Sequence, residues 1–214
     1  MKTILSLILL CFISMKTIAK NSDSAAFNAG KIILSMGYGY PSLEQSQYGG
    51  IDPNYSFISF TKNNYGPFHF RGEYGLTNKI GIGISMNYDN YGGTMKEVHT
   101  INHSNGITEY YTSQKTTSSF TGLIRFNYHF ATTKKLDPYL AVGGGFRTTT
   151  NSFTTNDPNG SLSQYNLITI SRTPSNISFE SLVGLKYYFS KNIGIYSEIG
   201  ISKSVIQIGL SVGF

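Results

Sequence analysis

The 214-residue chain has no tryptophan, one cysteine and few charged side chains, which make up 13% of its residues. Cys11 lies in the apolar leading segment, so residues 20–214 contain no cysteine and cannot be held together by disulfide bonds. Lysine and arginine are spread thinly, with no cluster that would follow a phosphate backbone, so we expect no nucleic-acid partner. No segment after the leader has the roughly 20 apolar residues that a spanning helix needs.

Residues 1–19 are predicted to be a cleaved signal peptide. Lys2 precedes an apolar run from Ile4 to Met15 of about 12 residues, and small residues follow it up to Ala19. Leu9 and Leu10 stand before Cys11 where a lipidation signal has small residues, so ordinary cleavage is expected. The remaining chain, residues 20–214, is expected to be one exported domain.

The chain is rich in glycine, tyrosine and phenylalanine, with 23, 16 and 14 residues. Its final stretch, VIQIGLSVGF, alternates strictly, so every second residue from Ile206 to Phe214 is apolar and shares one strand face. A covered strand of a soluble sandwich and a lipid-facing strand of a membrane barrel both fit this pattern. The rest of the chain has to distinguish the two.

A period of two recurs along the chain and predicts an all-β protein. The expected strands are at 31–40, 66–76, 79–90, 117–130, 138–148, 176–189, 192–202 and 204–214. Most large aliphatic and aromatic residues fall on one face of these strands. The opposite faces carry charged groups, namely Arg71, Glu73, Arg125, His129, Glu180, Lys186 and Glu198.

These two faces favour a membrane barrel, because a soluble ligand-binding barrel fills its interior with apolar groups and turns polar ones to water. Here we expect the charges to pair inside a narrow lumen and the aliphatic side chains to meet lipid. An eight-stranded barrel is only wide enough inside for its own side chains, so salt-bridged packing is expected there rather than a pore.

The connections between the expected strands alternate in length. Strands two and three, four and five, and six and seven are joined by short turns, whereas long connections are expected at about 41–65, 91–116 and 149–175. An up-and-down barrel with periplasmic termini has short periplasmic turns and long extracellular loops in this order. Aromatic residues are expected as two girdles at the ends of the strands: Tyr74, Tyr128, Phe130, Tyr187, Phe189 and Phe214 at the periplasmic end, and Tyr38, Phe68, Tyr88, Phe120, Phe146 and Phe179 at the outer end.

The chain resembles the small eight-stranded outer-membrane barrels of the OmpX and OmpA type over nearly all of residues 20–214. The terminal IQIGLSVGF and the segment DPYLAVGGGF at 137–146 carry the resemblance. It implies an outer-membrane location, outer-membrane lipids and lipopolysaccharide as neighbours, and recognition of the last strand, ending in Phe214, by the barrel assembly machinery. OmpA-type proteins often continue into a peptidoglycan-binding domain, whereas this chain stops at Phe214, so no cell-wall anchor is expected.

No residue is assigned a catalytic, cofactor-binding or metal-binding role. In INHSNG, His103 and Ser104 are adjacent and point to opposite strand faces, and Asn105-Gly106 indicates a hairpin turn instead. Four residues of strand separate His99 from His103 by about 13 Å, too far for one metal ion. Asp157 to Gly160, with a single carboxylate, reads as a turn within a second projecting hairpin rather than a calcium site.

The sequence therefore predicts a non-enzymatic, monomeric outer-membrane barrel that contributes to envelope integrity or to surface interaction. Its extracellular loops, rich in Tyr, Ser, Asn and Gly, would contact a protein or glycan ligand. Two alternatives stay open: a lipid-modifying barrel enzyme, either acyl hydrolase or acyltransferase, and a small-solute channel. No cofactor is expected.

Overall fold

The structure is a computed structural model that describes residues 25–46, 48–51, 59–100, 108–156, 168–170 and 176–214. The expected signal peptide at 1–19 lies outside the described residues. Eight long strands form the body of the protein: β1 (Ile32–Ser42), β4 (Tyr65–Gly75), β5 (Ile80–Thr100), β6 (Thr108–His129), β7 (Leu136–Thr155), β9 (Ile177–Tyr188), β10 (Ile193–Ile201) and β11 (Ser204–Gly213). Each predicted strand is confirmed, with boundaries that differ mainly at the end that carries the long connections.

These eight strands close into an antiparallel barrel. β1 pairs with β4 on one side and with β11 on the other, where Leu34 lies opposite Val212 and Met36 opposite Leu210. The remaining neighbours follow in order, and β5 pairs with β6 to complete the ring. Closure leaves no free edge within the barrel body, because every strand there has two partners. The predicted all-β, up-and-down, eight-stranded barrel is thus confirmed.

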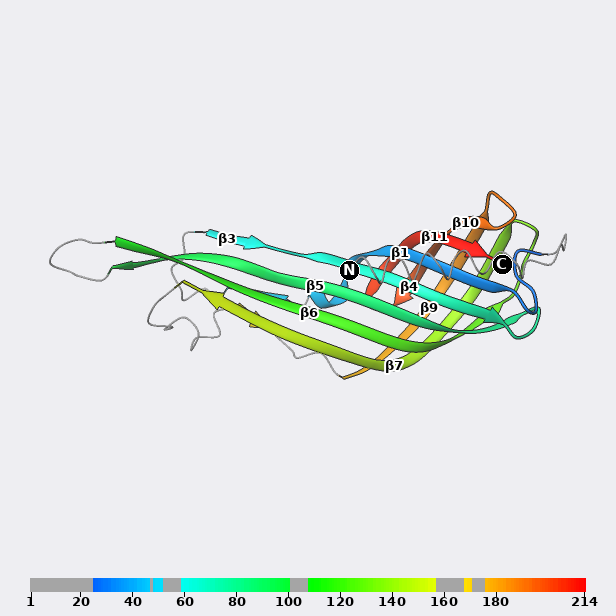
Figure 1. Cartoon of the computed structure of the whole chain (residues 1–214), viewed down its shortest axis with the longest axis horizontal. Coiled ribbons are helices and arrows are strands. Elements are labelled where there is room, and N and C mark those ends of the chain that lie inside the picture. Colours follow the sequence, from blue (N-terminus) through cyan, green and yellow to red (C-terminus); the bar gives the residue numbers. More distant parts are fainter. Residues whose placement is uncertain (1–24, 47, 52–58, 101–107, 157–167, 171–175) are drawn as a thin grey trace, which may run out of the picture.

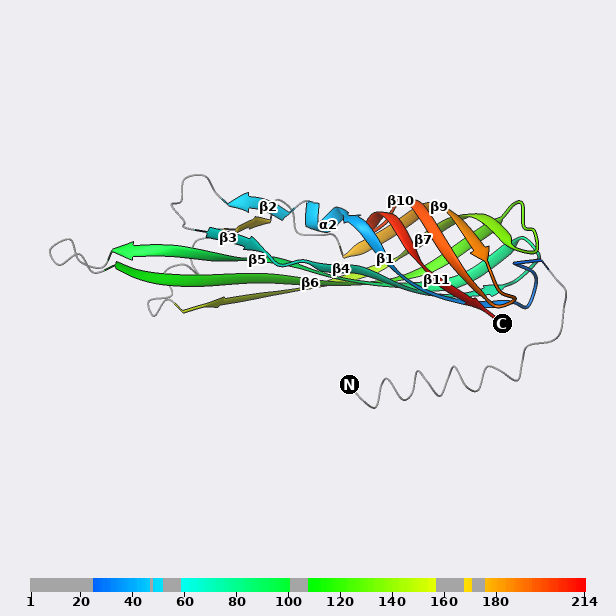
Figure 2. The same cartoon turned by 90° about the horizontal axis from the view of Figure 1, so that it is seen from above.

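Long connections lie at one end of the barrel and short turns at the other (Figure 1). β5, β6 and β7 continue far past the barrel body at the long end, and β3 (Ser59–Lys62) pairs with β5 there. β2 (Tyr48–Ile51) pairs with β8 (Ile168–Ile170), and the four-residue helix α2 (Leu43–Ser46) follows β1 (Figure 2).

β5, β6 and β7 extend further at the long-connection end than predicted. Residues 91–100 and 108–116, expected in a loop, continue β5 and β6 and pair up to Thr100 opposite Thr108. The predicted hairpin is therefore present, with its Asn105-Gly106 turn outside the described residues. In the third connection β7 runs on to Thr155 against β6, whereas Ile168–Ile170 pairs with β2. Threonine and tyrosine favour the strand conformation. The strand pairing therefore extends into these segments, which were predicted to be loops because their composition is polar.

The outside of the barrel is apolar. Large aliphatic and aromatic side chains are exposed there on every strand, including Met36, Phe70, Ile84, Ile124 and Val183. Eleven of the twelve predicted girdle aromatics are exposed outward and Phe214 is half-buried. A soluble monomer rarely exposes a contiguous apolar patch beyond a few hundred Å², so a continuous belt of this kind requires lipid around it.

Inward-facing glycines make room for large side chains in the lumen. A Cβ at Gly184 would overlap the Tyr139 ring, and one at Gly209 would overlap the Met36 carbonyl and the Tyr196 ring. These positions account for part of the glycine content, since a narrow barrel can hold aromatic rings only where the facing residue has no side chain. Among the described residues, no helix has the length and apolar character needed to cross a membrane.

Candidate functional site

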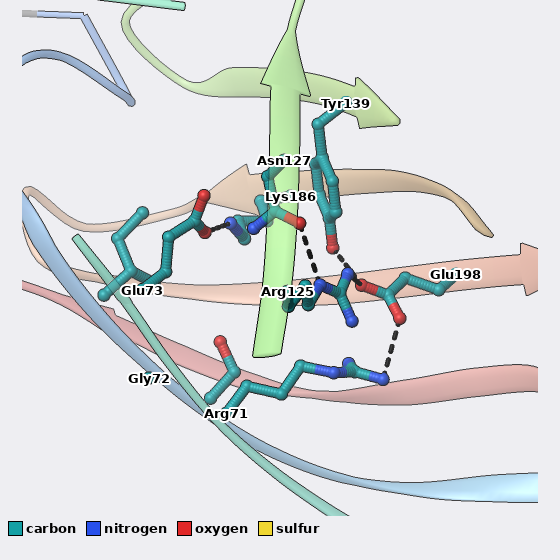
Figure 3. A pocket seen from close by; sticks show the side chains of 10 residues that line it. Arg71, Gly72, Glu73, Arg125, Asn127, Tyr139, Lys186 and Glu198 are labelled. Atoms are coloured by element: carbon teal, nitrogen blue, oxygen red, sulfur yellow. Dashed lines mark hydrogen bonds and ion pairs between the residues drawn. The ribbon is translucent and has the colours of Figure 1, made fainter. Parts of the chain in front are cut away.

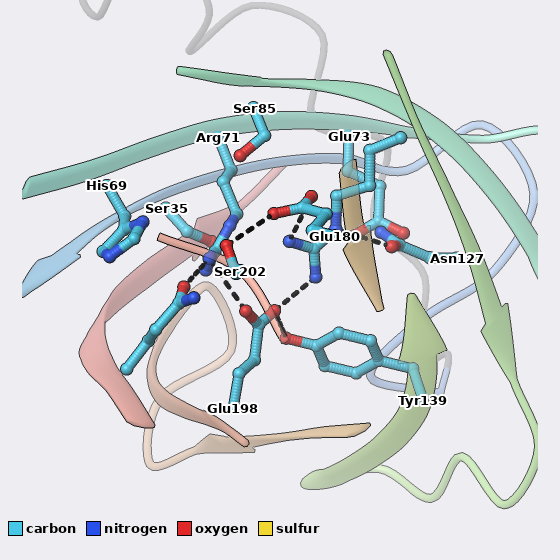
Figure 4. A network of polar contacts seen from close by, with 12 residues as sticks. Ser35, His69, Arg71, Glu73, Ser85, Asn127, Tyr139, Glu180, Glu198 and Ser202 are labelled. Atoms are coloured by element: carbon cyan, nitrogen blue, oxygen red, sulfur yellow. Dashed lines mark hydrogen bonds and ion pairs between the residues drawn. The ribbon is translucent and has the colours of Figure 1, made fainter. Parts of the chain in front are cut away.

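The centre of the lumen is an ion-pair network built around Arg125 on β6. Its guanidinium contacts the Glu180 carboxylate on β9 at 3.2 Å and also contacts Glu198 on β10. Arg71 on β4 reaches the second oxygen of Glu198 at 2.8 Å. The Tyr139 hydroxyl donates a hydrogen bond to Glu198 at 2.6 Å (Figure 3). The side chains of two arginines and two glutamates thus link β4, β6, β9 and β10 (Figure 4).

A second network lies nearer the short turns. Lys186 Nζ contacts Glu73 Oε2 at 2.7 Å and lies 3.9 Å from Asp137 Oδ2. His129 bridges the same two carboxylates, with Nε2 at 2.8 Å from Glu73 and Nδ1 at 2.6 Å from Asp137. Lys186 and His129 therefore each contact both carboxylates.

All seven charged residues predicted to face inward are buried, and the paired, filled lumen is confirmed. Sequence reasoning missed other members of the networks, which are His69, Asp137, Tyr139, Tyr196 and Gln207. The strand period could have identified them, because each is next to an apolar residue that faces outward. The two tyrosines were not recognised because aromatic residues were expected only in the girdles.

Little space remains among these side chains. The cavity between Arg71, Glu73 and Arg125 has a volume of about 10 Å³. A site of that size accommodates roughly one water molecule. The described lumen is therefore packed at its middle, between the side chains of Arg71, Glu73 and Arg125.

The short-turn end is closed by the segment that precedes β1. Phe27 is 1% exposed and its ring stacks on the His129 imidazole, with centroids 3.5 Å apart and planes 6° apart. The Ala26 amide donates to the Thr133 carbonyl at 2.7 Å, and Lys31 Nζ donates to the Ala26 carbonyl at 2.7 Å. These bonds hold Phe27 as a cover over the second network.

The opposite end is closed by α2 and the turn between β10 and β11. Glu44 of α2 contacts Arg147 at 3.0 Å and Lys203 at 3.6 Å. Lys203 folds back into the barrel mouth and donates to the Ser119 hydroxyl at 2.8 Å. Burial lowers the pKa of Lys203, against the opposing pull of the Glu44 and Asp89 carboxylates.

Asp89 holds the C-terminal end of β1 at the same opening of the barrel. The Ser42 hydroxyl donates to Asp89 at 2.6 Å and the Gln45 side-chain amide donates to it at 2.7 Å. Because α2 follows β1 directly, these contacts hold the helix across the opening. Both ends of the described barrel are thus covered by the chain itself.

One arrangement has the order of a nucleophile, base and orienting group. His69 Nε2 lies 3.0 Å from the Ser204 hydroxyl, and His69 Nδ1 lies 2.6 Å from Asn87 Oδ1. Ser204 and His69 are 0% exposed and sit inside the lumen. Because Ser204, His69 and Asn87 are all enclosed, these three groups form a buried polar network that joins β4, β5 and β11 rather than a site open to a substrate carbonyl.

We expect Ser204 to be inert toward a fluorophosphonate probe. The folded protein in detergent should show labelling no greater than that of a Ser204→Ala variant, because the hydroxyl is enclosed and the reagent cannot approach it. Mass spectrometry of the treated protein measures this directly. Stoichiometric labelling at Ser204 that requires His69 would instead show an accessible hydrolase site.

The other sequence motifs stay without a chemical assignment. His103, Ser104 and Asp157 to Gly160 lie outside the described residues, as does the side chain of His99. Within the part of the chain that the structure describes, no group of three or more His, Cys, Asp or Glu residues is placed to hold a metal ion.

Comparisons with known proteins find similar solved structures at low identity. No family model and no curated protein matches the chain. Among solved structures, it is similar to the attachment invasion locus protein Ail of Yersinia pestis, at 12% identity over 87% of this chain and 99% of that one, with a TM-score of 0.42. OprG of Pseudomonas aeruginosa gives 12% identity, 88% and 97% coverage and a TM-score of 0.45. Outer membrane protein W of E. coli is 14% identical over 87% of this chain and 99% of that one, with a TM-score of 0.41.

The closed ring of strands, apolar exterior and charged, packed lumen define a transmembrane β-barrel of the kind found in bacterial outer membranes. It is an eight-stranded barrel, and three of its strands continue beyond the barrel body as a paired extension. This assignment rests on the chain's own pairing and surface.

Proposed function

We propose that the protein is a non-enzymatic surface protein of the bacterial outer membrane whose barrel anchors an extracellular interaction platform. The platform consists of β3 and the outer parts of β5, β6 and β7, at residues 91–100, 108–118 and 148–155. The observation that carries the proposal is the combination of a barrel filled and covered at both ends with a paired sheet that continues far beyond it (Figure 2).

The platform is paired and packed. β5 and β6 pair without a break from the barrel to Thr100 and Thr108, and β7 follows β6 up to Thr155. Tyr91, Met95 and Tyr111 are buried on its inner side. A segment held in this way presents its outer side chains with little loss of conformational entropy on binding.

The platform exposes residue types used in recognition surfaces on both of its faces, with Tyr110 on the outward face and Phe153 opposite Lys115 on the other. Tyr110 and Phe153 expose 59% and 42% of their surface. Thr148, Thr150 and Thr154 are exposed along β7. Exposed rings provide contact area, and hydroxyl groups provide adaptable hydrogen bonds, so the platform is suited to a protein or glycan partner.

The same observations weigh against the two alternatives. A channel needs a continuous lumen, and the described lumen is blocked by Phe27, by the ion-pair networks and by α2. A lipid-modifying enzyme needs a nucleophile that a lipid can reach, whereas Ser204 is enclosed. The barrel's contribution is therefore to anchor and orient the platform, with lipopolysaccharide around its outer half and the assembly machinery reading the strand that ends at Phe214.

We expect removal of the platform tip to abolish surface binding while the barrel still forms. Replacing residues 95–113 by Asn-Gly joins Thr94 to Gln114, which are direct partners in the β5–β6 register. Asn-Gly forms the two-residue turn that this register requires. Adhesion of intact bacteria to immobilised matrix proteins and glycans should fall to the level of cells without the protein, whereas the heat-dependent gel shift of the folded barrel should stay.

A point variant tests the same surface with the strands intact. Tyr110→Ser with Phe153→Ser should reduce adhesion, and Tyr110→Phe, which keeps the ring, should reduce it less. Resistance of the cells to detergents and large antibiotics distinguishes a role in envelope integrity from a role in adhesion. If the tip replacement lowers this resistance and leaves adhesion unchanged, the protein supports the envelope and the platform is not a binding surface.

A further inference from the structure

The charged side chains are divided sharply between the lumen and the outer surfaces. Every carboxylate whose side chain the structure describes is buried: Glu44, Glu73, Asp89, Asp137, Glu180 and Glu198. The exposed charged side chains in the same part of the chain are all lysines: Lys62, Lys79, Lys96, Lys134, Lys135 and Lys191. Every exposed charged side chain in the described part of the chain is therefore cationic.

Four of these six lysines lie at the short-turn end. Lys79 belongs to the turn between β4 and β5, Lys134 and Lys135 to the turn between β6 and β7, and Lys191 to the turn between β9 and β10. We call these three turns the lysine rim. They are the three hairpin turns of that end, and the strand order places them one after another around the barrel (Figure 1).

The turns of the lysine rim are held tightly. The Thr77 hydroxyl accepts a hydrogen bond from the Ile80 amide at 2.9 Å, and the Thr133 hydroxyl accepts one from the Leu136 amide at 2.9 Å. In the third turn the Ser190 amide donates to the Ile193 carbonyl at 3.1 Å. The lysine backbones are therefore fixed and only the side chains have to adapt to a ligand.

The lysine rim lies just beyond the aromatic girdle at the short-turn end. Exposed girdle residues lie where two of the three turns begin: Tyr128, Phe130, Tyr187 and Phe189. Aromatic girdles sit at the boundary between acyl chains and headgroups. Ammonium groups one turn further from the membrane centre lie where phosphate groups are, and their alkyl stems can follow the apolar surface.

A concave site lies beside Lys79 within the lysine rim. It has a volume of about 530 Å³ and is lined by residues that include Phe27, Asn28, Asn78, Lys79, Phe130 and Thr132. The lining combines an ammonium, two amides and a hydroxyl with an exposed ring at the lipid boundary. These groups match a phosphate with neighbouring hydroxyl or ester oxygens, whose acyl chains would run along Phe130.

We propose that the lysine rim binds anionic phospholipid headgroups of the periplasmic leaflet, with one phosphate held beside Lys79 in the concave site. The chemistry is a negatively charged glycerophospholipid, such as phosphatidylglycerol, next to an ammonium group. Zwitterionic headgroups gain less, because their own cation competes for the same phosphate. Such contacts would fix the depth and tilt of the barrel from its periplasmic side.

The test compares lipid binding by the folded full-length mature protein in detergent, with phosphatidylglycerol and phosphatidylcholine of the same acyl chains as probes. Native mass spectrometry gives the ratio of the two dissociation constants. Each rim lysine is expected to contribute about fivefold to the preference for phosphatidylglycerol, the factor that corresponds to roughly 1 kcal/mol per basic residue near an anionic surface. Added salt should weaken this preference.

The variants are Lys79→Gln alone, the double variant Lys79→Gln with Lys135→Gln, whose charge change the control equals, and the triple variant that adds Lys191→Gln. The matched control is Lys62→Gln with Lys96→Gln, which removes exposed charge from the extracellular strands. The rim variants should lose the preference stepwise and the control should keep it. An equal loss in the control would show a net-charge effect only, and an unchanged preference in the triple variant would show that the rim does not bind lipid; both overturn the proposal.

Discussion

Replacing Arg125 by methionine should destabilise the folded barrel by about 3–5 kcal/mol. The guanidinium is buried between Glu180 and Glu198, and methionine would fill part of its volume while leaving the carboxylates without it. The chain has no tryptophan, so the free energy of unfolding is best measured in urea and lipid vesicles by circular dichroism and by the heat-dependent gel shift.

Double-mutant cycles should show that Arg125 couples unequally to its two carboxylate partners. Without Arg125, Glu198 still contacts Arg71 at 2.8 Å and Tyr139 at 2.6 Å. Glu180 keeps the Ser202 hydroxyl, 3.2 Å away, among its described contacts. Glu180→Gln should therefore rescue Arg125→Met more than Glu198→Gln does, by a coupling energy of about 1–3 kcal/mol.

Glu73 provides the control for these cycles. It contacts Lys186 and His129 rather than Arg125, so Glu73→Gln should combine additively with Arg125→Met. Coupling below about 0.5 kcal/mol for both Glu180 and Glu198 would mean that water screens the pairs. The packed lumen, and with it the argument against a channel, would then be wrong.

Much of the barrel could be predicted from alternation alone, because the strand period assigns each side chain to one of two faces. Arg125 was correctly placed inward on that basis. Alternation does not choose its partner among Glu73, Glu180 and Glu198, because that choice depends on how β6 faces β9 and β10 across the lumen. That geometry follows from the tilt and stagger of the closed barrel, which a single strand does not encode.

The covers at the two ends could not be predicted, because they come from irregular segments. Phe27 precedes the first strand and belongs to no alternating pattern, yet its ring covers His129. Glu44 and Lys203 are 159 positions apart in sequence and meet only after closure. The Ser204, His69 and Asn87 contacts likewise join three strands, whereas the sequence drew attention to the adjacent His103 and Ser104.

Placing arginine at Leu210 should cost about 2–4 kcal/mol in a lipid bilayer. Leu210 is 51% exposed on the outside of the barrel, midway along the outward row from Ile206 to Phe214. If that surface met water, the substitution would change stability by no more than about 0.5 kcal/mol, as is usual for exposed positions. The size of the effect therefore reports directly whether lipid surrounds the barrel.

The control for this substitution must face lipid at a different depth. The neighbouring Ser211 is unsuitable, because it is 0% exposed and bonded to the Ser35 hydroxyl at 2.7 Å, so arginine there would disrupt the packed lumen. Ile193 is exposed at the start of β10, beside the lysine rim, and Ile193→Arg should cost only about 0–1 kcal/mol. Unfolding titrations in vesicles give both values, and fractionation of cells should recover the wild-type protein in the outer membrane after carbonate extraction. Equal, small costs at Leu210 and Ile193, together with recovery of the wild type as a soluble periplasmic protein, would overturn the membrane assignment, because an apolar belt that tolerates arginine at every depth does not face lipid.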